Sequence, residues 1–176
     1  MSEKELLNGQ AMSLQWVTYL LSMAEKDINI NDGKVVKELL CNAKTATGST
    51  RYEALEIGCL YACNFLLPFA IELALKSLLM KCEIKYSKKG QDGHNLEKLF
   101  EQLKQDKSKR DLQTKIQRKY EKLSDGISGS IKDILLQHKL DFAGWRYLDN
   151  PKNLSVQTKK LQFVLCAILE IYDKLT

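Results

Sequence analysis

The feature that most constrains the fold is a long apolar run over residues 57–80. The run is long enough for a membrane span, but Asn64, Pro68, Glu72 and Lys76 interrupt it. A lipid-facing helix would have to neutralise Glu72 and Lys76 at high cost. We therefore expect this run to be the central helix of a protein core, with no membrane partner.

Residues that favour tight turns are scarce, with 9 glycines and 2 prolines among 176 residues. A β-sandwich or barrel needs many such turns, so the composition favours long helices. The length suits a single domain, which we expect to cover residues 1–176. The expected fold is all-α, an up-and-down four-helix bundle with additional short helices, in which neighbouring helices pack antiparallel.

Hydrophobic residues that recur every three or four positions place the helices along the chain. The central helix is expected over residues 51–83, kinked or divided near Leu66 because Pro68 cannot donate a backbone hydrogen bond. A short helix over residues 34–43 and a loop over residues 45–50 are expected before it. The first helix is expected over residues 10–28, with an apolar stripe of Leu14, Val17, Leu20, Leu21, Ala24 and Ile28.

A polar, basic loop over residues 84–93 follows the central helix. A short helix then starts near Leu96, capped by His94 or Asn95, with Glu97 in its favourable first turn. Its apolar face is formed by Leu96, Leu99, Phe100 and Leu103.

Three further helices are expected towards the C-terminus. A solvated helix over residues 106–122 is broken by the glycines that follow it, and a helix over residues 131–140 comes next. The last helix starts near Asn150 or Asn153. Its buried face is formed by Leu161, Val164, Leu165, Ile168, Tyr172 and Leu175.

The cysteines and the first residues indicate the compartment. The cysteines number five, and none shows the close CxxC spacing of a zinc or redox site. They are expected to be small core residues in a reducing cytosol. The first residues are polar and acidic, so we expect no secretory signal and a cytoplasmic protein.

Motifs that would indicate catalysis are lacking. His94 and His138 belong to no metal-binding pattern, and no phosphate loop or nucleophile elbow is present, so no metal, cofactor or catalytic residue is expected. His94 is expected to cap or pack at a helix start, and His138 to lie at the surface near the last carbonyls of its helix. Glu72 and Lys76 have the spacing of a helical ion pair, and a buried Glu72 would need Arg146 or His94 as a partner.

Positive charge is concentrated in one region. The chain has 27 Lys and Arg against 22 Asp and Glu, and residues 98–122 hold nine basic and four acidic residues, which accounts for the whole net charge of +5. Such a region either binds RNA phosphate without sequence preference or is a solvated helix with pairs such as Asp111–Lys115. The residues expected to contact nucleic acid are Lys85, Lys88, Lys89, Lys107, Lys109, Arg110, Lys115, Arg118 and Lys119.

Three separated segments resemble the HEPN superfamily. Residues 69–79 (FAIELALKSLL) are similar to its "IELALKALL" helix, and residues 93–100 (GHNLEKLF) are similar to the "GHDLEKL" helix that follows. Residues 142–147 (FAGWRY) are similar to the "F..WRY" element of many uncharacterised bacterial HEPN-like proteins. The resemblance covers residues 51–175, and the three elements recur in the family's order.

This resemblance implies a helical bundle, often dimeric, of toxin–antitoxin, anti-phage defence or RNA-processing systems. Many HEPN proteins are metal-independent ribonucleases in which an Arg is followed about four to six residues later by a His. That pair supplies a cation for the phosphate and an imidazole for proton transfer. No histidine lies at this distance after Arg51, Arg110, Arg118 or Arg146, so the standard nuclease pair is absent.

An aromatic and basic corner at residues 145–147 gives a hypothetical binding pocket. There Arg146 would clamp an anion and Tyr147 would offer a stacking surface. In the alternative interpretation Trp145 plugs the end of the bundle, while Arg146 caps carbonyls or pairs with Glu72. The residues of the hypothetical pocket are Glu72, Lys76, His94, Trp145, Arg146 and Tyr147.

Three functions remain open at this point. The first is a HEPN-like binding or assembly module without the nuclease pair, for RNA, a nucleotide or a protein partner in a bacterial defence or toxin–antitoxin system. The second is a divergent metal-independent ribonuclease that uses Arg146 with His138 or His94. The third is a purely structural protein-interaction module. A homodimer is expected if exposed apolar faces of the first or last helix pair across a two-fold axis.

Overall fold

The computed structural model describes residues 2–24, 51–87, 91–108, 111–127, 129–139 and 157–175. Within these ranges the regular structure consists of six α-helices and two short 3₁₀ helices, without a strand, which confirms the all-α fold. The expected helix over residues 34–43 and loop over residues 45–50 lie outside the described residues. Among the described helices, none has both the length and the hydropathy that a membrane span requires.

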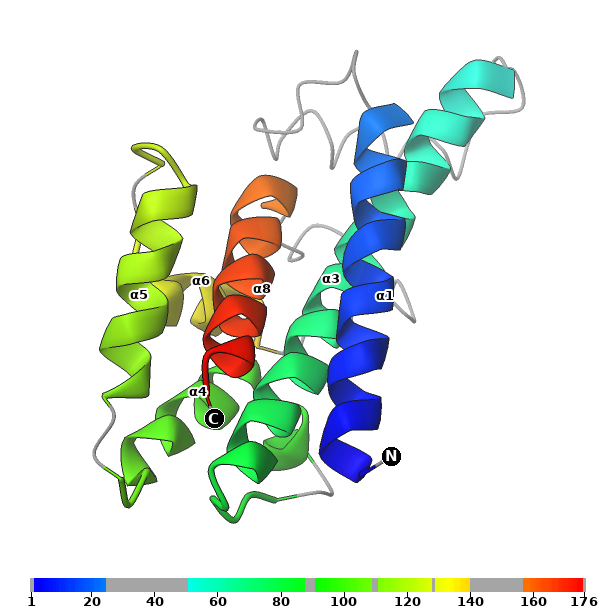
Figure 1. The fold of residues 1–176 in the computed structure, drawn as a ribbon. Coiled ribbons are helices and arrows are strands. Elements are labelled where there is room, and N and C mark those ends of the chain that lie inside the picture. Colours follow the sequence, from blue (N-terminus) through cyan, green and yellow to red (C-terminus); the bar gives the residue numbers. More distant parts are fainter. Residues whose placement is uncertain are drawn as a thin grey trace.

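The four long helices lie roughly side by side (Figure 1). Helices α3 (Arg51–Lys81) and α8 (Thr158–Asp173) occupy the middle and run in the same direction. Helix α1 (Glu3–Ala24) forms one edge against α3, and α5 (Leu112–Leu123) forms the opposite edge against α8. Both edge helices run antiparallel to the two central ones. The molecule therefore has two well-separated outer faces, one on α1 and one on α5.

The central helix α3 runs without a break from Arg51 to Lys81, with Pro68 inside it. Of the two outcomes expected near Leu66, a kink or a division of the helix, the division is therefore wrong. A proline in a helix interior costs about 3 kcal/mol, whereas burial of one large aliphatic side chain contributes about 1.5–3 kcal/mol. Leu67 and Ile71, on either side of Pro68, are fully buried, and α3 contacts α1, α4 and α8. Packing on several sides thus offsets the missing hydrogen bond.

Helix α1 begins at Glu3, well before the expected residue 10. The backbone N–H of Ser2 donates to Glu5 Oε2 at 2.7 Å, and the backbone N–H of Glu5 donates to Ser2 Oγ at 3.4 Å. These reciprocal bonds form a capping box, which satisfies two backbone donors at the helix start. The apolar spacing used for the prediction does not detect such a polar start signal.

The expected apolar stripe of α1 is confirmed at Leu14, which packs against the core, but not at Val17. Val17 was assigned to the apolar stripe but is 43% exposed, whereas Ala11 and Thr18 are fully buried. Their small side chains allow α1 to approach α3 closely, and side chains of α3 bond to the backbone of α1. Ser77 Oγ donates to the carbonyl oxygen of Lys4 at 2.7 Å.

The short helices position the turn that follows α3. Helix α4 (Leu96–Gln102) is capped by Asn95, whose side chain accepts from the backbone N–H of Lys98, as expected. A 3₁₀ turn, η2 (Leu103–Gln105), follows α4. Helix α5 then begins at Leu112 rather than residue 106 because Asp111 has a left-handed backbone with φ 49°. The solvated helix is therefore shorter than expected.

The remaining helices begin at clear local signals. Ser130 caps α6 (Ile131–Gln137) by accepting from the backbone N–H of Asp133 at 3.0 Å. Helix α8 begins at Thr158, so the expected start at Asn150 or Asn153 is wrong. Gln157 has φ −140° and ψ 48°, which is outside the helical region. The expected face is confirmed, since these residues are buried and Leu175 packs against the core: Leu161, Val164, Leu165, Ile168 and Tyr172.

Three of the five cysteines are described as free thiols that lie wholly or partly in the protein interior. Cys63 and Cys82 are buried, and Cys166 is partly buried, in agreement with the expected role as core residues. Gln15 Nε2 donates to Cys166 Sγ at 2.8 Å, which links α1 to α8. Burial raises the pKa of the Cys166 thiol above its usual value, so this side chain stays neutral. Cys41 lies outside the described residues.

Candidate functional site

A buried carboxylate joins α3 to the turn before α4. The side chain of Glu72 is 3% exposed, and its Oε1 lies 2.6 Å from Lys76 Nζ and 3.0 Å from His94 Nδ1. His94 follows the 3₁₀ turn η1 (Gln91–Gly93), and α4 packs against α3 directly after it. The predicted Glu72–Lys76 pair is confirmed, and of the two partners predicted for a buried Glu72, Arg146 or His94, the structure shows the contact with His94. We call these three residues the Glu72 cluster.

The second carboxylate oxygen of Glu72, Oε2, is buried and accepts no hydrogen bond within the described part of the chain. An unsatisfied buried acceptor costs about 1–3 kcal/mol, and more when it is charged. Lys76 and His94 compensate the charge through the other oxygen, Oε1. Oε2 therefore retains the capacity to accept a hydrogen bond from an N–H or O–H group.

His94 is the part of the Glu72 cluster that faces solvent. Its side chain is 51% exposed, in contrast to the buried carboxylate to which Nδ1 bonds. When Nδ1 donates its proton to a carboxylate, the lone pair of the ring lies on Nε2. A carboxylate that orients an imidazole in this way supports proton transfer at Nε2, or phosphate binding by the imidazolium form. Asn95, not His94, caps α4. The contact with Glu72 instead gives His94 the capacity for proton transfer or phosphate binding.

His138 differs from His94 because it lies inside the protein. It is 1% exposed at the C-terminal end of α6, and its backbone N–H donates to the carbonyl oxygen of Ile134. The prediction of a surface histidine is wrong. Residue 138 lies seven positions after Ile131, on the same helical stripe as the buried Ile131 and Ile134. The ring is thus part of the core and is not positioned to contact an RNA phosphate.

Several cations of the basic region are neutralised by specific acids. Lys98 Nζ lies 2.6 Å from Asp92 Oδ1, and Lys104 Nζ lies 3.7 Å from Glu101 Oε1. Lys119 Nζ pairs with Glu170 of α8 at 2.5 Å. Lys119 was expected to contact nucleic acid, but its charge is instead shared with this acid across the α5–α8 contact.

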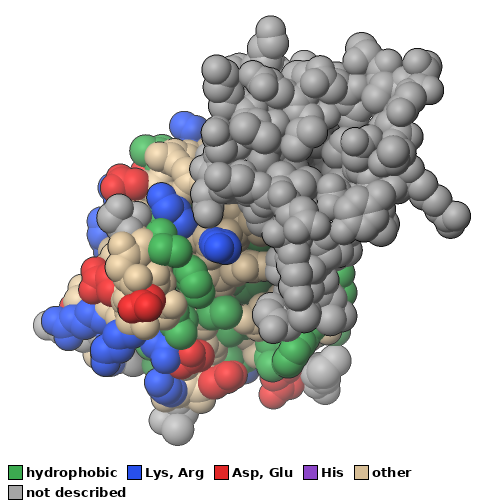
Figure 2. Space-filling model, turned by 90° about the horizontal axis from the view of Figure 1, so that it is seen from above, with side chains coloured by type: hydrophobic (Ala, Val, Ile, Leu, Met, Phe, Trp, Pro, Cys, Tyr) green, Lys and Arg blue, Asp and Glu red, His purple; other side chains and the backbone are tan. Residues whose placement is uncertain are grey.

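Other cations of α5 have no such partner. Lys115, Arg118 and Lys122 are exposed, and none makes an ion pair within the described residues. Their spacing of three and four residues places them in one row, away from the buried Leu112, Ile116 and Tyr120. We call these three side chains the open row. Lys and Arg side chains gather on the side of the molecule where α5 lies, with Asp and Glu between them (Figure 2).

Lys122 was counted in the charge excess but was not among the residues expected to contact nucleic acid. Its position four residues after Arg118 is the sequence signal that places it in the open row. Lys85, after the end of α3, and Lys107, in the turn before α5, are both exposed. Lys88, Lys89, Lys109 and Arg110 lie outside the described residues.

The aromatic corner of the hypothetical pocket also lies outside the described residues: Trp145, Arg146 and Tyr147. Glu72, Lys76 and His94 are therefore the members of that pocket whose contacts are known. They come together at one place, the side of α3 that faces the turn before α4. The expected contact between Arg146 and Glu72 stays a prediction.

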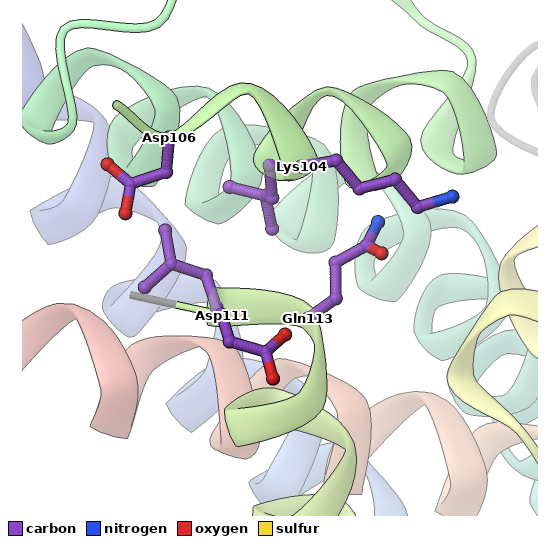
Figure 3. Close-up of a pocket in the computed structure, with 6 residues that line it drawn as sticks. Lys104, Asp106, Asp111 and Gln113 are labelled. Carbon is purple, nitrogen blue, oxygen red and sulfur yellow. The ribbon is translucent and has the colours of Figure 1, made fainter. Parts of the chain in front are cut away.

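A separate cavity lies between η2 and the start of α5. It has a volume of 290 Å³ and is bordered by Lys104, Asp106, Asp111 and Gln113 together with two leucines. The ammonium group of Lys104 points away from the two carboxylates (Figure 3). Asp106 Oδ1 already accepts from the backbone N–H of Ser108, and the described residues hold no cluster of three potential metal ligands. The cavity therefore offers a weaker basis for function than the Glu72 cluster or the open row.

Comparison of the chain with protein-family models, curated protein sequences and solved structures gave no match. The relationship to the HEPN superfamily therefore stays a prediction. Of the three segments that resemble it, residues 69–79 lie in α3 and residues 93–100 lie at the start of α4. Glu72 and His94, one from each of these segments, are in direct contact.

Proposed function

We propose that the chain is a HEPN-like module that lacks the ribonuclease pair and binds the phosphate backbone of RNA, within a bacterial defence or toxin–antitoxin system. The observation that best supports the proposal is the open row on α5. Lys115, Arg118 and Lys122 keep their charge available, whereas neighbouring lysines are paired to acids. Resemblance to HEPN proteins of RNA-processing systems supports RNA as the ligand class.

The geometry of the open row suits a phosphate backbone. The two ends of the row are seven positions apart on α5, which is about 10 Å at 1.5 Å per residue. A row of three cations of this length can contact neighbouring phosphates of one strand. Contacts of this kind position a nucleic acid without reading its sequence. Binding should therefore tolerate any sequence and weaken steeply with salt.

Affinity for a labelled single-stranded RNA of mixed sequence, measured between about 50 and 200 mM salt, tests the proposal. The triple substitution K115Q/R118Q/K122Q should weaken binding by about 10- to 100-fold. It should also reduce the slope of log affinity against log salt by about 2, because each lost contact contributes about 0.7 for a single strand. Competition by a mononucleotide would indicate a nucleotide site instead.

A matched control is available in the same chain. The triple substitution K98Q/K104Q/K132Q removes the same amount of charge from α4, η2 and α6, but each of these lysines is paired to an acid. It should leave RNA affinity within about 3-fold of the wild type, because paired cations contribute little to a phosphate contact. Equal losses in both triple variants would show that net charge, not the open row, determines binding. Absence of binding at low salt would refute the proposal.

One observation favours a second candidate, a divergent metal-independent ribonuclease. The buried Glu72 orients the exposed His94, which is the arrangement that a general acid–base requires. Of the two histidines named for this role, His94 is thus the suitable one, because His138 is buried. Arg146 would supply the cation for the phosphate.

Cleavage of RNA in the presence of EDTA distinguishes the two candidates. A ribonuclease of this kind should lose most of its activity in His94→Ala and in Arg146→Ala, and should lose part of it in Glu72→Gln. Thermal melting of each variant separates loss of chemistry from loss of folding. Weak cleavage that is identical in the wild type and every variant would indicate a contaminant.

A further inference from the structure

Glu170 of α8 places a negative charge against the cations of α5. Its Oε2 lies 2.5 Å from Lys119 Nζ of α5 and 3.8 Å from Nζ of Lys174, the residue that ends α8. The side chains of Lys119 and Glu170 are 24% and 39% exposed, so the contact lies at the surface, where α5 and α8 pack together. One carboxylate therefore lies between two ammonium groups at a place that a ligand of α5 can reach.

Lys119 adjoins the open row. It follows Lys115 by four residues and precedes Lys122 by three, which are the separations of neighbours on one face of a helix. At 3.6 residues per turn, Lys119 lies about 40° around α5 from Lys115. Its contact with Glu170 shows that this side of the row faces α8. Without Glu170, the ammonium group of Lys119 would therefore be within reach of the strand that contacts the open row.

A carboxylate and a phosphate are alternative partners of the same lysine. Ammonium groups make similar charge-assisted hydrogen bonds to the oxygens of both. An ion pair at the surface contributes little to stability, and the buried Ile116 and Tyr120 already attach α5 to the core. The main consequence of the Lys119–Glu170 contact is thus the neutralisation of Lys119.

We propose that Glu170 is an intramolecular competitor of RNA phosphate, which retains Lys119 and limits the number of phosphate contacts that α5 makes. This inference rests on the proposed RNA binding by the open row, and it adds the residue that restrains that binding. Lys174 is 67% exposed and lies 3.8 Å from the carboxylate, so its charge is already available to solvent. Lys119 is therefore the cation whose availability Glu170 controls.

Removal of the competitor should add one phosphate contact. Each contact with a single strand contributes about 0.7 to the slope of log affinity against log salt, so Glu170→Gln should steepen this slope by about 0.7. The same contact corresponds to about 5-fold tighter binding at about 0.1 M salt. Lys119→Gln alone should leave the slope unchanged, because Lys119 makes no phosphate contact in the wild type. In E170Q/K119Q the slope should return to the wild-type value.

Glu121→Gln is the matched control for loss of a negative charge. Glu121 is exposed on α5, its Oε1 accepts from Gln117 Nε2 at 3.0 Å, and it makes no ion pair with another described residue. Its removal changes the electrostatic potential around the open row without releasing a cation. The slope should therefore stay at the wild-type value, whatever the change in affinity. Thermal melting should place each variant within about 2 °C of the wild type.

The experiment measures the affinity of the full chain and these four variants for a labelled single-stranded RNA of mixed sequence, between about 50 and 200 mM salt. A steeper slope in Glu170→Gln that requires Lys119 would support the proposal. An unchanged slope in Glu170→Gln would overturn it, and binding by the wild type would then leave the open row as the RNA site. An equal gain in Glu121→Gln, or a gain that persists in E170Q/K119Q, would overturn it as well.

Two outcomes separate this proposal from the proposed function. Binding by Glu170→Gln without binding by the wild type would refute RNA binding by the intact chain, but it would support competition by Glu170. Absence of binding at low salt in both proteins would overturn both proposals.

Discussion

The two edge helices, α1 and α5, both cover the central pair α3 and α8, yet their outer faces are opposite in character. Helix α5 buries Leu112, Ile116 and Tyr120 and exposes charged side chains between them. Helix α1 buries small residues and exposes large apolar ones. Because the inner faces suffice to attach each helix, the outer faces are not determined by the fold. Their composition instead reflects what they meet, which at α5 we propose is the phosphate backbone of RNA.

The largest expected effect comes from weakening the attachment of α5. Ile116 is fully buried, and Ile116→Ala should lower the free energy of unfolding by about 2–5 kcal/mol, because it leaves a cavity in a packed interface. The exposed Arg118→Ala is the matched variant two residues away and should change it by less than about 0.5 kcal/mol. Urea unfolding curves measure both. A small loss for Ile116→Ala would mean that α5 is not anchored as the structure indicates.

The start of α1 provides the next effect. Ser2→Ala removes one partner of the capping box and should lower the melting temperature by about 2–4 °C. Hydrogen bonds from Ser2, chiefly from its backbone N–H, lower the pKa of Glu5 below its usual value. The stabilisation that these bonds give is therefore fully present at pH values above the usual pKa of Glu5, and it is lost as the pH falls through the lowered pKa. Because Ser2→Ala keeps the backbone N–H that bonds to Glu5 Oε2 and removes only Oγ, most of the advantage of the wild type should persist in acid. Melting temperatures at neutral and acidic pH, with Ser13→Ala as control, measure this difference.

The buried hydroxyl of Tyr120 provides a further test of the inner face of α5. Tyr120 is fully buried, and its hydroxyl has no hydrogen-bond partner within the described residues. Tyr120→Phe should therefore change the free energy of unfolding at neutral pH by less than about 1 kcal/mol. Burial raises the pKa of Tyr120, so wild-type stability should fall as the pH rises above the usual value of about 10.

Tyr120→Phe removes this alkaline loss, because phenylalanine does not titrate. Unfolding curves at neutral and alkaline pH measure the difference between the two proteins. A large loss for Tyr120→Phe at neutral pH would show that the hydroxyl has a partner that stabilises the fold.

Sequence patterns predicted the contacts that are local or periodic. The cap at Asn95, the buried face of α8 and the contact of Glu72 with His94 all follow from short-range spacing or from the needs of a buried acid. Patterns of apolar residues did not reveal the start of α1, because a capping box consists of polar residues.

Sequence patterns also could not predict which basic residues remain available to a ligand, and here the reason is different. Lys119 pairs with Glu170 and Lys132 pairs with Glu101, and both pairs join residues far apart in the sequence. A count of charges treats Lys119 and Lys115 as equivalent, although the fold neutralises one and leaves the other open. Tertiary structure therefore decides which part of a basic region can bind phosphate.

The smallest expected effect tests whether such ion pairs stabilise the fold. Lys132 Nζ contacts Glu101 Oε1 at 2.7 Å, which connects α6 to α4 at the surface. Its hydrogen bond lowers the pKa of Glu101, so the contribution is present at neutral pH and is lost as the pH falls through the lowered value. Because both side chains are partly exposed to solvent, Lys132→Gln should lower the melting temperature by no more than about 2 °C in low salt and by less in high salt. A larger fall would mean that the paired lysines help to hold α4 and α6 together. The RNA affinity of K98Q/K104Q/K132Q would then have to be corrected for its unfolded fraction before it is compared with that of K115Q/R118Q/K122Q.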